Sequence, residues 1–410
     1  MMGPCVMMSA LVLFFGPQVD LSYPPDYTQL CLAEENLPQY NLDLPFPEGR
    51  SSHYIKFTCA IQQLGWNNVL NELLMNSFLA YKLNQAYIFS EYAYTWPPCT
   101  PLSALIAGPT VGGSWLIGDP APRAISEQYF ELPALTDLNS TEIFAAWQKI
   151  LIDAPQECIE IQPADRSEDG YPQVFDLWLW GSWRVLLLWD AFSKSPVSQL
   201  LHTSPIVERM VNANLDLFTA GHKDVNPFSQ MLALHLQRGN FKEACLSLSN
   251  WNLMFYSWNL HEFLPDKFTP PAGGGWGYNM LENKVLYMKH CLPSDEDVLK
   301  KIQDSRGDYL DTIMSQGLKE EIDDLYLLMN DDSEWLDEVK RIMKADRWKV
   351  VAMSRDLKLD QECKDVGMAV DMEIVRKASV FIGNGWLSFT SNILHRWLVD
   401  GKIPISNHFY

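Results

Sequence analysis

Three short segments combine residue types that bind phosphate, sugar or base, and each follows a predicted strand. The first is QQLGWNN at residues 62–68. A glycine followed by two carboxamides at a strand-to-helix turn presents backbone N–H groups and side-chain amides to phosphate or sugar oxygens. Gly65, Asn67 and Asn68 are therefore candidate ligand-binding residues. The structural alternative is that Asn67 or Asn68 caps the following helix.

The second segment is HLQRGN at residues 235–240, at the end of a predicted buried strand. A cation at such a strand end can meet the diphosphate of a nucleotide sugar and stabilise the charge that develops on the leaving group. His235 and Arg238 are the candidates for this work. In the structural alternative, Arg238 pairs with an acid and His235 is a buried histidine with its hydrogen bonds satisfied.

The third segment joins VDME at 370–373 with FIGN at 381–384 and SFTS at 388–391. The hydroxyls of Ser388, Thr390 and Ser391, with the amides that open the last predicted helix, form an anion site. Asp371 can accept two hydrogen bonds from the N–H groups on the edge of a guanine. The structural alternative is simple capping of the helix by Ser388.

Other nucleotide and metal motifs are missing. The sequence has no GxGxxG followed by an acid at the right distance and no GKS/T loop, so a nicotinamide oxidoreductase or a P-loop enzyme has little support. None of the Cys residues forms a CxxC pair, which argues against a zinc knuckle. Asp295-Glu296-Asp297 matches a metal-binding DxD in letters, but its place in the first turn of a predicted helix favours dipole complementation. No metal ligand is predicted.

The segments that must position these residues alternate between strand and helix. In the first half, a strand at 54–60, a helix at 69–84 and a strand at 86–89 form a βαβ unit, which is typical of a parallel sheet. The rest of this half is predicted as follows: a loop region at 93–135, a helical region at 141–217 and a buried strand at 229–236 that ends at His235.

The second half repeats the alternation after a Gly/Pro-rich break at 265–277. The predicted elements are a helix at 295–305 capped by Ser294, strands at 325–329, 349–353 and 380–383, and helices at 333–345 and 388–398. We predict an α/β protein of two Rossmann-like domains facing a central cleft, the usual place for a ligand. The predicted divisions are a Pro-rich, extended lead-in at 1–52, an N-terminal domain at 53–264 and a C-terminal domain at 265–410.

The composition and the apolar N-terminal residues limit the partners that the protein can bind and indicate the cellular compartment in which it is expected. A formal charge of −20 on 410 residues disfavours nucleic-acid binding. Membrane association is expected only through the apolar residues 1–16, which are too few to span a bilayer. A sequon at Asn139-Ser140-Thr141 and this apolar start make the secretory pathway, ER or Golgi, the expected location.

In this order, GWNN, HLQRG and VDMEI…FIGNGWLSFTSN resemble the GDP-fucose-dependent protein O-fucosyltransferase family, with the look closest to its fungal members. The resemblance covers about Tyr54 to Tyr410. It implies a GT-B fold, no cofactor, GDP-fucose as donor and metal-independent transfer of fucose, with inversion, to a Ser or Thr hydroxyl of a protein or glycan acceptor. By position it implies these roles: Arg238, Gln237 and Asn67 catalytic; Gly65, Asn68, His235, Asp371, Ser388, Thr390 and Ser391 substrate-binding.

The middle segment departs from the family pattern. The family has His-x-Arg, often HLRRGD, and its first arginine is expected to neutralise the β-phosphate. This sequence has Gln237 there, and Asn240 where an acid is common. Losing a charge-matched donor at a transition state costs about 100-fold in rate. Neighbouring residues at a strand end point to opposite faces, so Arg238 is not expected to substitute. The alternative function is a catalytically weakened or inactive GDP-sugar-binding or protein-interaction relative.

Overall fold

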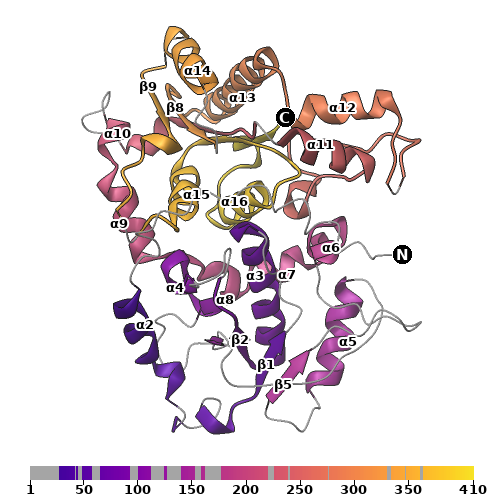
Figure 1. Ribbon diagram of the computed structural model, residues 1–410, viewed down its shortest axis with the longest axis vertical. Coiled ribbons are helices and arrows are strands. Elements are labelled where there is room, and N and C mark those ends of the chain that lie inside the picture. The colour runs from indigo at the N-terminus through magenta and orange to yellow at the C-terminus, as the bar shows by residue number, and fades with distance from the viewer. Residues whose placement is uncertain are drawn as a thin grey trace. The chain divides into compact units, whose positions relative to one another are not determined.

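The computed structural model describes residues 27–41, 43–44, 49–57, 65–92, 100–111, 124–126, 140–152, 158–161, 177–219, 226–238, 241–275, 277–329, 334–346, 348–360 and 363–410. The chain forms two compact units (Figure 1). Unit 1 comprises Met1–Val207 and Gln361–Val366, and unit 2 comprises Glu208–Asp360 and Gly367–Tyr410. Residues 1–16, the sequon asparagine Asn139 and Asn240 lie outside the described residues, so the predictions made for them stay predictions.

Unit 1 contains an open sheet of parallel strands in the order β4-β2-β1-β5. Its strands are β1 (Tyr54–Phe57), β2 (Ala86–Phe89), β4 (Ala124–Ser126) and β5 (Cys158–Ile161). Helix α3 (Trp66–Leu83) connects β1 to β2, which confirms the predicted βαβ unit. The prediction of a loop at 93–135 was wrong at β4, at α4 (Leu102–Leu105) and at β3 (Ile106–Ala107), and that of a helical region at 141–217 was wrong at β5 and at β6 (His202–Thr203). These elements have 2 to 4 residues, too few to produce a periodic signal.

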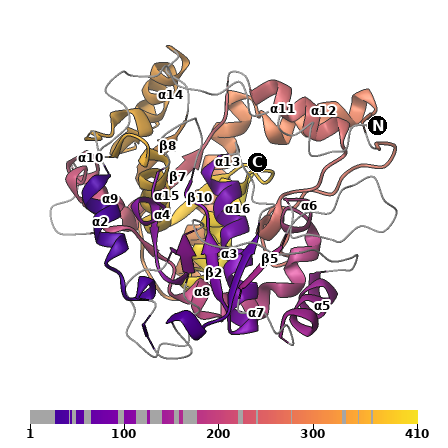
Figure 2. The ribbon, with the colours of Figure 1, turned by 60° about the horizontal axis from the view of Figure 1, so that its bottom comes forward.

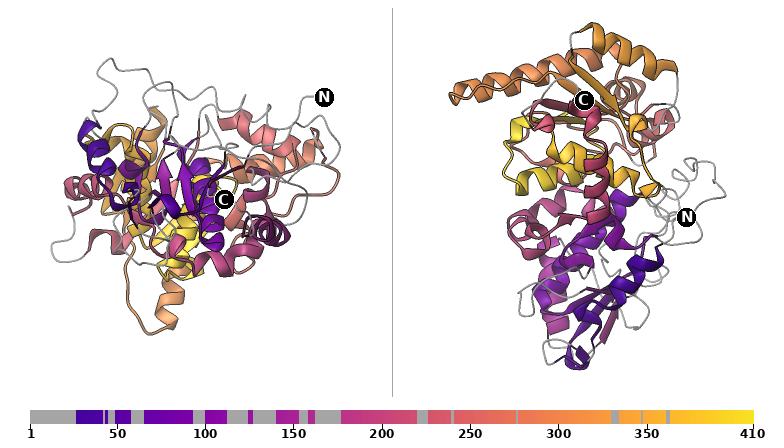
Figure 3. Two further views of the ribbon diagram at one scale, coloured as in Figure 1. Left: turned by 90° about the horizontal axis from the view of Figure 1, so that it is seen from below. Right: turned by 90° about the vertical axis from the view of Figure 1, so that its left-hand side faces the viewer.

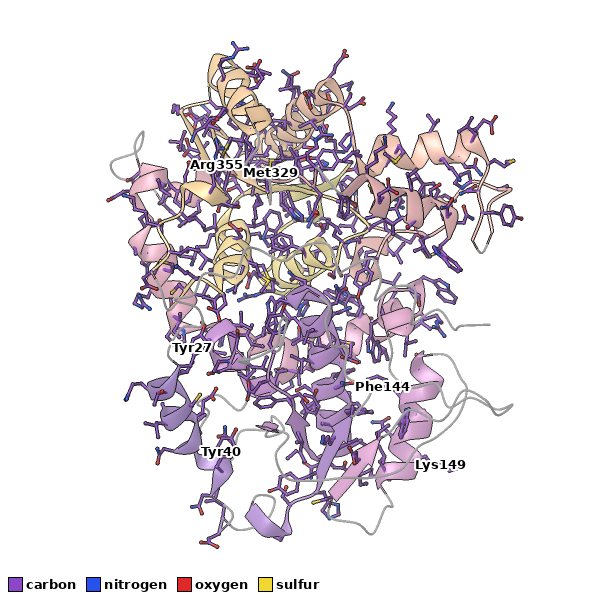
Figure 4. The ribbon with its side chains drawn as sticks, viewed as in Figure 1. Tyr27, Tyr40, Phe144, Lys149, Met329 and Arg355 are labelled. Carbon is purple, nitrogen blue, oxygen red and sulfur yellow. A yellow bond between two sulfur atoms is a disulfide. The ribbon has the colours of Figure 1, made fainter. Side chains whose placement is uncertain are left out.

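Helices α3 and α5 (Ser140–Ile152) lie beside β1, β2 and β5 (Figure 2). They pack through the rings of Phe78 and Phe144, whose centroids are 5.2 Å apart (Figure 4 labels Phe144). The predicted lead-in at 1–52 was wrong in being wholly extended, because the proline-free segment TQLCLAEE forms α2 (Thr28–Glu35). The remaining elements before unit 2 are α4 (Leu102–Leu105), β3 (Ile106–Ala107), α6 (Leu177–Trp180), α7 (Trp189–Ser193), α8 (Pro196–Gln199), β6 (His202–Thr203) and α9 (Pro205–Ala213), which crosses the division.

Unit 2 contains a second open parallel sheet, in the order β11-β10-β7-β8-β9. Its strands are β7 (Met231–His235), β8 (Asp324–Leu328), β9 (Val350–Met353), β10 (Val380–Gly383) and β11 (Asn407–Phe409). The structure confirms the four strands predicted for this part of the chain, each within two residues of its predicted ends. It adds β11, which pairs with β10 beyond the helix predicted to close the domain.

The five strands of unit 2 are fully buried because helices cover both faces of the sheet. In Figures 1 and 3, α13 and α14 lie on one face and the yellow α15 and α16 on the other. Leu234, Leu327 and Ile382 point into the core under α13, and Phe381 packs against Trp397 of α16. The helices of unit 2 are α10 (Asp216–Thr219), α11 (Phe241–Asn250), α12 (Leu281–Cys291), α13 (Asp295–Ser315), α14 (Glu334–Ala345), α15 (Gly367–Lys377) and α16 (Ser388–Val399).

The compact units divide at Val207/Glu208, whereas the sequence placed the domain division at 264/265. The reason is β7, which lies in the middle of the second sheet between β8 and β10. Residues 208–264 therefore belong with the C-terminal part of the chain, and the Gly/Pro-rich break is a connection within unit 2. Composition marks where a chain turns, but not which sheet a strand joins.

This division predicts how fragments behave. A fragment of residues 208–410 retains all five strands of the second sheet, whereas residues 265–410 lack the central strand β7. We expect the longer fragment to unfold cooperatively in urea, followed by circular dichroism, and the shorter one to show no cooperative transition. A cooperative transition of 265–410 at the same urea midpoint would contradict the assignment of β7 to this unit.

Candidate functional site

The site of unit 2 is set by its strand order. The first strand along the chain, β7, lies between the second, β8, and the fourth, β10, so the winding of the sheet reverses between β7 and β10. Open α/β sheets bind ligands at this switch point, outside the carboxyl ends of the strands. The two chemistry-bearing segments of this unit follow these two strands: His235 ends β7, and Ser388 opens α16 directly after β10.

The structure brings the two segments into contact. The ring of His235 lies against the ring of Phe389, with a centroid distance of 4.6 Å. Gln237 is half-buried beside them, and its Nε2 is 3.4 Å from Nε2 of His235. Burial lowers the pKa of His235 to about 4, so the ring is neutral at pH 7. His235 can therefore act at this edge as a neutral hydrogen-bonding group and not as the predicted cation.

Arg238 points away from this contact. Its Nη2 donates to Oδ1 of Asp295, the first residue of α13, at 3.0 Å. This is the structural alternative stated for Arg238, and it follows from the alternation of side chains along the strand end. Gln237 accompanies His235 on the side of α16, while Arg238 reaches α13 on the other side of the sheet. Asp295 thus has an ion-pair partner as well as a place in a helix capped, as predicted, by Ser294.

The N-terminus of α16 is the part of the site best suited to an anion. Its N-cap is Leu387, which has no capping side chain, so Ser388 is the first helical residue, and the structural alternative that Ser388 caps the helix was wrong. The amides of the first turn are therefore not satisfied by a capping side chain. Of the predicted hydroxyls, that of Ser388 is half-buried. Thr390 and Ser391 are buried, and Ser391 accepts the backbone N–H of Trp258 at 3.2 Å.

Close packing explains why glycine ends β10. A Cβ on Gly383 would lie 2.6 Å from the side chain of Thr390, so α16 can approach the strand this closely only because position 383 has no side chain. The Thr390 hydroxyl is fully buried there and has no hydrogen-bond partner among the described residues. Thr390 therefore sets the distance between helix and strand, and it does not present an open hydroxyl.

The sequence analysis missed the residues that hold the turn at 384–387. Nδ2 of Asn259 donates to the backbone oxygens of Gly385 and Leu387, at 2.9 and 3.3 Å. Nδ2 of Asn384 donates to the carbonyl of Cys291 at 3.1 Å, and its Oδ1 accepts the backbone N–H of Trp386. The turn is thus fixed in place before any ligand binds. A buried polar residue in an apolar segment, such as Asn259 in SWNL, was the available signal.

Asp371 was predicted to follow a strand, but it lies within α15. Its Oδ1 accepts the hydroxyls of Tyr326 in β8 and of Ser354, which directly follows β9; the Ser354 distance is 3.0 Å. The carboxylate therefore fastens α15 to the sheet on the face that α16 also covers, and its Oδ2 accepts no bond from the described residues. The predicted role at guanine stays a prediction.

In unit 1 the winding of the sheet reverses between β1 and β5, and α3 begins after β1 at this switch point. Gly65 is the N-cap of α3, so the alternative that Asn67 or Asn68 caps the helix was wrong. Asn67 is buried and Asn68 half-buried in the first turn. As with α16, no side chain caps the helix, and the amide of Asn68 donates to the carbonyl of Gly65 at 2.9 Å.

Among the described residues, no group of three or more His, Cys, Asp or Glu could hold a metal ion. No helix within the described ranges is both long and apolar enough to cross a membrane.

No family model and no curated protein matches the sequence. Solved structures do match the fold. POFUT1 in complex with GDP matches over 88% of this chain and 98% of its own, with a TM-score of 0.50 at 13% identity. POFUT1 in complex with GDP-fucose gives 0.48 at 14% identity over 87% and 98%. The fucosyltransferase NodZ from Bradyrhizobium gives 0.39 at 10% over 85% and 92%. At such identities the shared feature is the fold: two Rossmann-like domains of the GT-B class.

The burial of Asp371 predicts a pH-dependent stability. Burial raises the pKa of its carboxyl from 3.8 to about 6, although the Tyr326 and Ser354 hydroxyls act in the opposite direction. The folded state therefore holds this proton more tightly than the unfolded state, and the protein loses that stabilisation as the pH rises from 3.8 to about 6. Asp371→Asn removes the titration. We expect the unfolding free energy of Asp371→Asn, measured in urea, to rise relative to that of the unmodified protein as the pH increases across this window. Above pH 7 the difference between the two proteins should stay constant.

The matched control is Asp308→Asn, which removes an exposed acid of α13. Two outcomes would refute the proposed cause: a difference in unfolding free energy between Asp371→Asn and the unmodified protein that is constant from pH 4 to pH 7, or one in which the unmodified protein becomes the relatively more stable of the two as the pH rises.

Proposed function

We propose that this protein is a glycosyltransferase that binds GDP-fucose at the carboxyl ends of β7 and β10 and transfers fucose to a Ser or Thr hydroxyl of a protein or glycan acceptor. The observation that supports this most is the contact of His235 with Phe389. It joins two of the three segments that resemble the O-fucosyltransferase family at the switch point of a Rossmann-like sheet. The fold is that of a POFUT1 structure that contains GDP.

In this proposal the diphosphate lies at the N-terminus of α16. The uncapped amides of its first turn and the Ser388 hydroxyl donate to phosphate oxygens, and the helix dipole favours the charge. The amide of Gln237 adds a neutral donor, and His235 helps to hold the nucleotide. Asp371 accepts from guanine, and Asn67 and Asn68 contact the diphosphate or the acceptor. The acceptor hydroxyl oxygen forms a bond to C1 of fucose on the side opposite the β-phosphate, and the bond from C1 to the β-phosphate oxygen breaks. The electron pair of that bond leaves with GDP, the hydroxyl proton passes to water, and no metal takes part.

A second candidate function is a GDP-sugar-binding relative with weak or no turnover. It is favoured by the ion pair between Arg238 and Asp295 together with the neutral His235 and Gln237. Of the residues in the described part of the HLQRG segment, His235 and Gln237 then offer no positive charge to the leaving group and Arg238 is engaged with Asp295. Removal of one charged donor typically lowers a rate about 100-fold.

The disulfide between Cys245 and Cys291 supports the proposed location in the secretory pathway. Such bonds persist in oxidising compartments and are rare in the cytosol.

The proposal is tested first by calorimetric titration with GDP, GDP-fucose and NAD. We expect GDP and GDP-fucose to bind and NAD not to bind. Absence of GDP binding at millimolar concentration would overturn the proposed function, and binding without transfer or donor hydrolysis would select the second candidate.

Gln237→Arg tests the catalytic defect. If the neutral amide is what limits charge stabilisation, the guanidinium should raise donor hydrolysis or transfer by about 100-fold, read from GDP release. The matched control is Gln316→Arg, which adds the same charge at an exposed position after α13. Equal rates for the two variants, or already fast turnover by the unmodified protein, would show that Gln237 is not the limiting group.

Asp295→Asn tests whether the ion pair with Asp295 keeps Arg238 from binding a diphosphate. Loss of the carboxylate frees the guanidinium to reach a diphosphate, and we expect GDP to bind about 5-fold more tightly at low salt. The control Asp297→Asn removes an acid from the same helical turn that has no bond to Arg238. The gain should vanish when Arg238→Met is combined with Asp295→Asn; a gain that survives would point to a general charge effect.

A further inference from the structure

The helix pair α11 and α12 presents one helix face of unit 2 to solvent. The two helices lie side by side in Figures 1 and 2, and the Cys245–Cys291 disulfide joins them. On its inner side, α12 buries Asn283, Tyr287 and Cys291, each four residues after the last. Tyr287 donates its hydroxyl to the carbonyl of Leu253 at 2.9 Å, and Asn283 donates to Ala272 at 3.0 Å. The inner contacts therefore fix the orientation of the outer face.

That outer face is apolar at its centre. The residues Leu281, Val285 and Leu286 are 73%, 63% and 38% exposed. A spacing of four places Leu281 above Val285 in a short apolar stripe, and Leu286 lies about 100° further round the helix and widens this stripe on one side. Two exposed charged residues flank the stripe, Glu282 towards the N-terminal end of the helix and Lys289 towards the C-terminal end. Large aliphatic side chains this exposed, clustered on one rigid helix, mark an interaction surface.

The order of these residues makes the face complementary to itself. Consider a second copy of α12 packed antiparallel, with a twofold axis between Val285 and Leu286. Val285 then lies opposite the partner's Leu286, and Glu282 lies opposite the partner's Lys289. The twofold axis generates each contact twice. Two contacts between Val285 and Leu286 therefore form the aliphatic centre, and one ion pair between Glu282 and Lys289 lies at each end of it. A parallel arrangement would bring Lys289 against the partner's Lys289.

We propose that α12 is a homodimerisation helix and that a second copy of this chain covers its outer face. This interface is independent of GDP and of the proposed activity. One helix of 11 residues is about 16 Å long. The buried area is consequently small, and the expected dimer is a weak one with a dissociation constant in the micromolar range.

Sedimentation velocity of the full chain, from about 1 to 200 μM, measures the association. We expect reversible dimers, and Val285→Asp should weaken them at least about 100-fold, because it places an unpaired carboxylate at the centre of the interface. The matched control is Met314→Asp, which introduces the same charge at a methionine of α13 that is 67% exposed and should leave the association unchanged.

Charge exchange tests the antiparallel geometry itself. Glu282→Lys and Lys289→Glu each place like charges opposite one another twice, and each variant should associate about tenfold more weakly. When the two variants are mixed, both cross pairs become attractive, so heterodimers should form with the affinity of the unmodified protein, and added salt should reduce the difference.

A chain that stays monomeric up to the highest concentration overturns the proposal. So does a dimer that Val285→Asp leaves intact, since another surface then forms it, or a mixture of the charge variants that associates no better than either alone. Binding of the monomer to anionic phosphatidylserine vesicles through these same residues would assign the face to a membrane and would equally overturn it.

Discussion

The pairing of β10 with β7 is the contact on which the candidate site depends. These strands are far apart in sequence, yet their parallel register places Gly383 and His235 at the same edge of the sheet of unit 2. Because no side chain extends from Gly383, α16 packs directly on the strand, and its first turn comes to lie beside His235. Asn259 and Asn384 hold the intervening turn, so the amides of α16 are oriented in advance. Orientation in advance lowers the entropic cost of binding an anion there.

Charge is arranged around this edge in an unusual way for a diphosphate site. The whole chain has a formal charge of −20, and His235, whose ring lies against Phe389 in the first turn of α16, is neutral at pH 7. Arg238 is adjacent in sequence but is paired with Asp295 across the sheet. An anionic ligand must therefore rely on backbone amides and neutral donors, or compete with Asp295 for the guanidinium. Under the proposed function, this balance is what separates an active transferase from a binding protein, and Gln237→Arg is the substitution that shifts it most directly.

Much of unit 2 could be predicted from residue patterns alone. The strands β7, β8, β9 and β10 are continuous apolar runs because both faces of their sheet are buried, and such runs stand out between polar helices. The start of α13 could be predicted from Ser294, because a capping hydroxyl before acidic residues is a local signal for a helix N-terminus. In unit 1, α3 and β2 are similarly clear. The strands that escaped prediction are short: β4, β5 and β11 have 3 or 4 residues, and β3 and β6 have 2. They obtain their stability from neighbouring strands.

The sequence by itself determined that three segments follow strands and which residue types they offer: a glycine turn before α3, the neutral Gln237 after β7, and the hydroxyl-rich start of α16 after β10. Only the tertiary structure decided how these residues are used. It placed β7 in the second sheet and not the first, buried Thr390 and Ser391, turned Arg238 towards Asp295 and engaged Asp371 with Tyr326. The physical reason is that strand partners and the two faces of a sheet are set by long-range contacts, whereas capping, periodicity and turn formation depend on neighbours a few residues away.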